Sequence, residues 1–152
     1  MTMRDNNYDE YQMINRQKIA FRTLVITLIL VFLNGMITEM HEWATPTIQA
    51  TLILELATGY FITCAIFKNA YLSRKVKNPY ANAILFAILG ISNVVAPIVF
   101  LARLGSSHLI SDGKLTSETI PIMPLILGVF FLYISAIIFI KALMERRQND
   151  DV

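Results

Sequence analysis

The chain has 152 residues, of which 55% are hydrophobic and 16% are charged, and its net charge is +2. A soluble globular domain carries roughly 25% charged residues, so this composition argues against a soluble domain. The apolar residues lie in four blocks and are not interrupted by a polar residue every three or four positions, so we expect an integral membrane protein. The single cysteine, Cys64, excludes an internal disulfide framework and a clustered-thiol metal site.

Residues 1–18 are polar and carry charges of both signs, and we expect them to form a cytoplasmic tail. Two interpretations stay open for it: a loosely ordered tail, or a short helix from Asp5 to Arg22 that leads into the membrane and contacts a partner. Residues 19–37 are almost wholly apolar and approach the roughly 30 Å of a hydrocarbon core at about 1.5 Å per residue. This apolar stretch starts late and ends in polar residues, which predicts a retained span and not a cleaved signal peptide.

Three further spans follow along the chain. Thr45-Pro46 predicts a helix start, because proline tolerates the first helical turn and threonine can cap it, and the second span covers residues 46–67. A basic loop leads to the third span, residues 80–102, in which Pro97 is either a hinge or a static packing feature. Residues 103–120 have the composition of a solvent-exposed loop. The fourth span covers residues 121–140, and residues 141–152 form a second tail.

The lysine and arginine residues predict the orientation of these spans. Eleven of them lie on one side: four up to Arg22, four in residues 68–79 and three after residue 140. Only Arg103 and Lys114 lie on the other side. Cytoplasmic flanks hold the excess of Lys and Arg, so we expect both tails to lie in the cytoplasm. The membrane that the spans cross is expected to be the cell membrane, namely the bacterial cytoplasmic membrane. The basic loop could also contact anionic lipid or nucleic acid, but setting the topology accounts for it, and we expect no direct nucleic-acid partner.

The expected fold is all-α, an antiparallel four-helix bundle in the membrane, because lipid forces each span to satisfy its own backbone groups. Each span carries small or polar residues at helical spacing, and we expect these stripes to meet inside the bundle. The stripes are Thr23, Thr27 and Asn34 in the first span; Thr51, Glu55, Thr58 and Gly59 in the second; Gly90, Asn93 and Pro97 in the third; and Pro121, Pro124, Gly128 and Ser135 in the fourth.

Glu55 is the most informative single residue, because a carboxylate near the middle of a bilayer is costly and such residues tend to mark proton, ion or substrate pathways. Asn93 lies at a similar depth and is its expected hydrogen-bond partner. The full candidate site consists of Glu55, Asn93, Asn34, Thr51 and Thr58. Two interpretations stay open: a proton-coupled or cation-binding site, or a protonated Glu55 that joins helices by hydrogen bonds.

The outer segment after the first span contains Glu39, His41 and Glu42, yet their spacing does not favour a metal site. We expect Trp43 to anchor the membrane interface and the acids to be solvated. His108 is isolated in the other outer loop. We therefore expect no catalytic residue, no metal and no cofactor.

About a quarter of the chain carries a D-E-x-Q stretch, a basic juxtamembrane segment, an apolar span that ends near Asn-Gly, and then a Trp and a Pro. The residues are Asp9, Glu10, Gln12, Lys18, Asn34, Gly35, Trp43 and Pro46. In this it resembles small uncharacterised four-span proteins of Gram-positive bacteria, although Tyr11 stands where an arginine is expected. Such proteins are often encoded beside helix-turn-helix regulators, so the resemblance implies a membrane-bound regulatory partner on the cytoplasmic side.

Three functions compete at this point. The first is a non-enzymatic membrane protein that acts through contacts, as a partner of a transcription regulator or of a membrane complex. The alternative is a small proton- or cation-coupled transporter or channel that uses Glu55. It would be a homo-oligomer, because four helices leave little room for a pathway within one chain. A membrane enzyme ranks last, because the sequence shows no convergent acid, base or metal cluster near an interface.

Overall fold

The computed structural model describes residues 10–68, 70, 79–104, 110, 111, 113–115 and 122–150. They form four α-helices, α1 (Glu10–Met40), α2 (Pro46–Phe67), α3 (Pro79–Leu104) and α4 (Ile122–Asp150), and two short strands, β1 (Ile110–Ser111) and β2 (Lys114–Leu115). Each helix is long and apolar enough to cross a membrane. The predicted all-α class with four spanning-length helices is confirmed.

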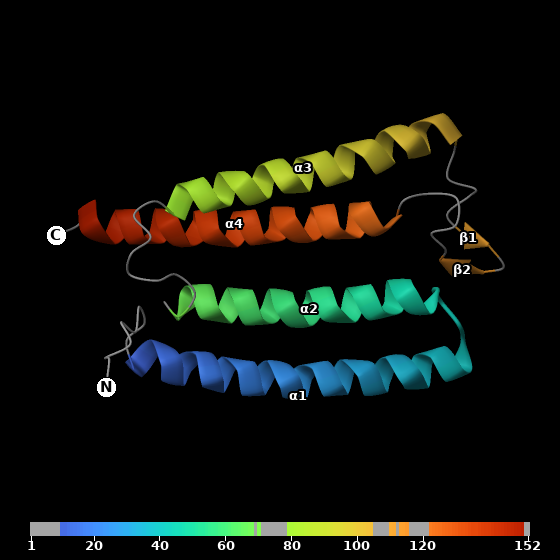
Figure 1. Ribbon diagram of the computed structural model, residues 1–152, viewed down its shortest axis with the longest axis horizontal. Coiled ribbons are helices and arrows are strands. Elements are labelled where there is room, and N and C mark those ends of the chain that lie inside the picture. Colours follow the sequence, from blue (N-terminus) through green and yellow to red (C-terminus); the bar gives the residue numbers. More distant parts are fainter. Residues whose placement is uncertain are drawn as a thin grey trace, which may run out of the picture.

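The helices pack in the order α1, α2, α4, α3, as Figure 1 shows. Helices α1 and α2 form one antiparallel hairpin, and α3 and α4 form another. The two hairpins meet through α2 and α4, which lie side by side and run in the same direction. The predicted antiparallel arrangement therefore holds within each hairpin but not at the central pair, because helices two steps apart in the chain point the same way.

Helix α1 begins and α4 ends at one end of this row, which we call the terminal end. The opposite end carries residues 41–45 and the two strands, and we call it the capped end (Figure 1). Both α1 and α4 extend beyond their apolar stretches at the terminal end, because Glu, Gln, Lys, Arg and Met are good helix formers in water as well. Lys141 Nζ and Glu145 Oε1, 3.2 Å apart on successive turns of α4, add to this extension.

Helix α2 begins at Pro46, as predicted. Thr45 occupies the N-cap position with extended backbone (φ −63°, ψ 149°), but its hydroxyl makes no capping hydrogen bond. The predicted threonine side-chain cap is therefore wrong. The first turn is closed by the backbone, where Gln49 N donates to Thr45 O at 3.1 Å.

The closest helix contact joins α3 to α4 through glycines. A Cβ atom added at Gly90 would lie 2.7 Å from Leu132 Cγ and 2.9 Å from the Leu132 backbone nitrogen. One added at Gly128 would lie 3.0 Å from the carbonyl oxygen of Gly90. Ser135 Oγ also donates to Ala83 O of α3 at 2.7 Å. The small-residue stripes of these two helices therefore face each other, which lets the backbones approach closely.

Two apolar clusters hold the central α2–α4 seam. Ile48 of α2 and Ile122 of α4 form one at the capped end, with Leu52, Met123 and Ile126 packed against them. Toward the terminal end, Ile66 of α2 meets Ile134 and Ile138 of α4. The middle of the seam lies between these clusters.

The predicted loop over residues 103–120 contains two short strands at the capped end among its described residues. β1 and β2 pair antiparallel around Gly113, whose positive φ of 76° suits a glycine. Leu115 then pairs with the α1–α2 connection: Leu115 N donates to Trp43 O at 2.9 Å, and Thr45 N donates to Leu115 O at 3.1 Å. The two connections at this end are thus joined by backbone hydrogen bonds.

Candidate functional site

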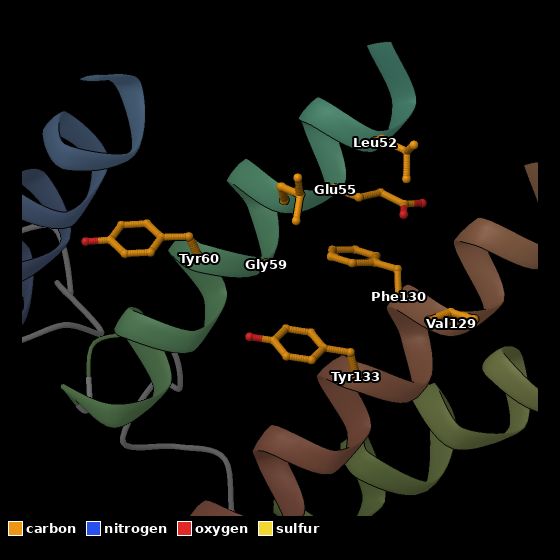
Figure 2. A pocket seen from close by; sticks show the side chains of 8 residues that line it. Leu52, Glu55, Gly59, Tyr60, Val129, Phe130 and Tyr133 are labelled. Carbon is orange, nitrogen blue, oxygen red and sulfur yellow. The ribbon is translucent and has the colours of Figure 1, made fainter. Parts of the chain in front are cut away.

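Glu55 lies on the face of α2 that packs against α4, and its carboxyl group points toward α4 (Figure 2). The side chain is half-buried. Its Oε1 atom is fully buried, and none of the described residues hydrogen-bonds it. The acid predicted from the sequence is therefore placed at a helix contact without a partner for one of its oxygens.

A groove of about 330 Å³ surrounds this carboxyl group at the middle of the α2–α4 seam. We call it the Glu55 groove; it is lined by Leu52, Glu55, Leu56, Gly59 and Tyr60 of α2 and by Val129, Phe130 and Tyr133 of α4. In Figure 2 the Phe130 ring lies beside Glu55, whereas Tyr60 points away from it toward α1. Apart from Glu55 and the two tyrosine hydroxyls, the lining is apolar.

The side chains around Gly59 explain why the seam opens here. Gly59 packs against Phe130 and Tyr133, whose nearest ring atoms would lie 3.4 Å from an added Cβ. Tyr133 is held in turn by a 2.6 Å hydrogen bond between its hydroxyl and Thr63 Oγ1. This hydrogen bond holds the Tyr133 side chain toward the terminal end, so it does not fill the space beside Glu55.

Asn93 does not join Glu55. It lies on α3 at the contact with α4, where its Cβ would be 3.0 Å from a Cβ added at Gly128. Its Nδ2 donates to Leu89 O of its own helix at 2.8 Å. The expected Glu55–Asn93 hydrogen bond is wrong, because α4 and not α3 packs against the Glu55 face of α2.

Thr51 and Thr58 also lie outside the Glu55 groove. Thr51 Oγ1 donates to Thr47 O within α2 at 2.9 Å, and Thr58 is exposed. Thr58 follows Glu55 by three residues and lies on a side of α2 that is exposed. The predicted stripe of α2 therefore faces inward only at Glu55 and Gly59.

Asn34 belongs to a separate polar cluster near the capped end. Gln49 of α2 is its buried centre, with Oε1 accepting from Asn34 Nδ2 at 2.8 Å and from Thr38 Oγ1 at 3.1 Å. Gln49 Nε2 donates to Ala44 O at 2.7 Å, and Trp43 Nε1 donates to Asn34 Oδ1 at 3.3 Å. We did not predict Gln49, although an amide within an apolar span is a signal that a partner is needed. The polar groups of this cluster hydrogen-bond one another, and these bonds join α1 to α2.

Glu42 differs from its prediction, whereas the role of Trp43 as an interface anchor stays a prediction. Trp43 is half-buried and hydrogen-bonded within the protein. Glu42 forms an ion pair with Lys114 of β2, so it is not merely solvated. The hydrogen bond and the charge of Lys114 lower the pKa of the Glu42 carboxyl group below its ordinary value.

The remaining sequence candidates contribute little to a site. Within the ranges that the structure describes, no three His, Cys, Asp or Glu side chains gather as a metal site would require. Cys64 is half-buried and packs beside Ile19 and Ala65 at the α1–α2 contact. Pro97 is buried within α3, which continues through it. His108, Pro121 and most of the basic loop lie outside the described residues.

The five predicted site residues thus do not form one site, and Glu55 is the one of them that lines the Glu55 groove. Comparison of the chain with protein-family models, with curated proteins and with solved structures finds no match.

Proposed function

We propose that this chain is a multi-pass membrane protein that acts through protein contacts and not through chemistry. In this proposal all four helices cross a cell membrane, with the terminal end in the cytoplasm and the capped end outside. The observation that carries it is the Glu55 groove, where a buried carboxyl oxygen lacks a partner in the part of the chain that the structure describes.

The physical argument starts from the surroundings of Glu55. In hydrocarbon, an unsatisfied polar group costs several kcal/mol, and lipid tails offer no donor. The rim of the groove is exposed: Leu56 is 61%, Val129 57% and Tyr133 42% accessible. A helix of another protein laid along this rim would cover these side chains and could bring a donor to Glu55, which makes the groove a contact site.

A second contact surface is proposed at the terminal end. Helix α1 begins at Glu10 and presents exposed Tyr11 and Ile14 on one face, ahead of the apolar stretch that starts at Ile19. These side chains would meet water and not lipid, so a cytoplasmic protein could cover them. A transcription regulator is the partner that the resemblance to Gram-positive four-span proteins implies.

Coupled transport of protons or cations by an oligomer is the second candidate, and the same carboxyl group favours it. The lining around Glu55 favours contact over transport, because apart from Glu55 and the two tyrosine hydroxyls it is apolar, and a transport path needs successive polar groups. Reconstituted vesicles separate the two functions. A proton or cation flux that is lost in Glu55→Gln would support transport, and equal flux in both proteins would count against it.

Site-specific photo-cross-linking in living cells tests the contact function. A photoreactive phenylalanine derivative at Leu56 should give a discrete protein adduct, and this adduct should disappear when Glu55→Gln is added. The matched control position is Leu28, which is equally exposed at 61% on α1 and does not line the groove. Adducts to lipid alone at Leu56, or the same protein adduct at both positions, would refute the proposal.

A further inference from the structure

We infer that the partner which completes the Glu55 groove presents a lysine or arginine side chain from one of its own transmembrane helices. This inference rests on the proposed contact function and names the chemistry of the partner. It follows from three features of the groove taken together: an acid, aromatic rings and apolar walls.

Each feature matches one part of a long basic side chain. The walls, formed by Leu52, Leu56 and Val129, suit its aliphatic stem, which packs on apolar surface while the charged end reaches further. The Phe130 and Tyr133 rings can attract a cation over their faces. The Glu55 carboxyl group, which lines the groove, can accept a charge-assisted hydrogen bond from its tip. A neutral hydroxyl or amide could donate a hydrogen bond to Glu55, but it would not gain the cation–π attraction of the Phe130 and Tyr133 rings.

A second copy of this chain cannot supply that cation. Its thirteen Lys and Arg residues all lie outside residues 23–67, 80–102 and 115–140. Those ranges include every position at the depth of Glu55, so the basic residues of another copy would stay near the membrane surfaces. The donor must come from a different protein.

The shape of the groove favours a helix over a small organic cation. Sites for small molecules bury about 70–90% of the ligand surface. Here the rim on both helices is open, and it runs along α2 and α4, which lie side by side in the same direction. A helix that follows this seam covers the rim along its length, whereas a compact molecule would leave it exposed.

Designed transmembrane peptides test the inference directly. The purified protein is placed in phosphatidylcholine vesicles, and its binding to labelled leucine-alanine peptides of about 20 residues is followed by Förster transfer. One peptide carries a central lysine, and its control carries norleucine, which has a similar aliphatic stem without the charge. We expect the lysine peptide to bind about tenfold more tightly, as one interhelical polar contact in a membrane would allow.

The protein variants assign this preference to the groove. It should vanish in Glu55→Gln and in Glu55→Leu, and it should persist in Thr58→Val, which changes an exposed polar residue of α2 outside the groove. Equal binding of the lysine and norleucine peptides would overturn the inference, as would a lysine preference that survives in Glu55→Gln.

Two further outcomes would assign the groove to another occupant. Glu55-dependent transfer between labelled copies of the protein itself would overturn the inference in favour of self-association. Glu55-dependent binding of tetraphenylphosphonium without binding of the lysine peptide would make the groove a small-molecule site. If the adduct at Leu56 identifies a partner without Lys or Arg in its spans, the inference fails while the proposed contact function stands.

Discussion

A methyl group added at Gly128 should loosen the α3–α4 hairpin. The new Cβ would lie 2.7 Å from Val94 Cγ2, 3.0 Å from Asn93 Cβ and 3.0 Å from the carbonyl oxygen of Gly90. Carbon atoms in contact normally lie about 3.5–4.0 Å apart, so the two carbon contacts are too short. The approach to the Gly90 oxygen is also tighter than nearly all real Cβ contacts. Since one of these atoms belongs to the backbone of α3, a side-chain rotation alone cannot relieve the overlap, and the helices must separate.

The expected cost follows from overpacking and helix propensity. Overpacking of a tight contact costs about 1–3 kcal/mol in free energy of unfolding. Alanine is a better helix former than glycine by about 0.5–1 kcal/mol, which partly offsets this cost. Gly35→Ala is the matched control, because Gly35 lies within α1 and a Cβ there meets nothing within 4 Å. The propensity gain is common to both variants, so their difference isolates the overpacking of about 1–3 kcal/mol.

Reversible unfolding of the purified protein in mixed micelles, followed by far-ultraviolet circular dichroism as SDS is added, measures this difference. Gly128→Ala should unfold at a lower SDS fraction than the parent protein, and Gly35→Ala at an equal or higher one. Gly90→Ala should resemble Gly128→Ala, because its Cβ would approach the backbone of Leu132. If Gly128→Ala is as stable as Gly35→Ala, the close approach of α3 and α4 is refuted.

Further predictions concern the capped end and the topology. Gln49→Leu should lower the free energy of unfolding by about 1–3 kcal/mol, because it leaves buried polar groups without partners, and the same SDS titration measures it. Glu42 has a lowered pKa in the folded protein, so its contribution is present above its unfolded pKa and is lost as the pH falls through the lowered folded value. The fluorescence of the single tryptophan should follow this loss, and Lys114→Gln should remove the pH dependence. With Cys64→Ser as background, an impermeant maleimide added to intact cells should label Lys114→Cys and not Arg147→Cys; the reverse pattern would refute the proposed orientation.

The lengths and approximate positions of the helices could be predicted because they follow from local sequence. The four apolar blocks determine how many long helices form. The proline at position 46 determines where α2 begins. The extension of α4 to Asp150 was missed, since hydropathy marks the apolar part of a helix and not its ends. For α1, a helix ahead of the span was one of the two interpretations left open, and the structure agrees with it from Glu10 onward. The packing order could not be predicted, because every span has apolar faces that would suit lipid or any neighbour equally well.

Only part of the candidate site could be predicted, again because the sequence does not determine which helices pack together. Glu55 stood out by its chemistry alone, and the structure places it in a groove. The predicted hydrogen bond from Glu55 to Asn93 required α2 and α3 to be in contact. Equal depth in the membrane does not determine which helices are in contact. Gln49 was missed because its partners, among them Asn34 and Thr38, become neighbours only when α1 folds back on α2.

Glu55 differs from the other polar residues within the helices in a way that links stability to function. The hydroxyls of Thr23, Thr27 and Thr63 donate to their own helices, and Ser135 donates to a neighbouring helix. Thr45 Oγ1 and Glu55 Oε1 are buried without a partner among the described residues, and Thr45 lies at the capped end, outside the helices. A polar residue that serves binding to another protein lacks its partner in the isolated chain, so it is expected to reduce the stability of that chain.

Glu55→Leu should therefore stabilise the isolated protein while it abolishes the contact. Leucine matches the apolar walls formed by Leu52 and Leu56, and it removes a buried unsatisfied group whose cost is about 1–3 kcal/mol. The SDS titration should show a higher midpoint for this variant, and the photo-adduct at Leu56 should be lost. A purely structural Glu55 would give the opposite stability result: the variant would unfold more easily, because a bond that holds α2 to α4 would have been removed.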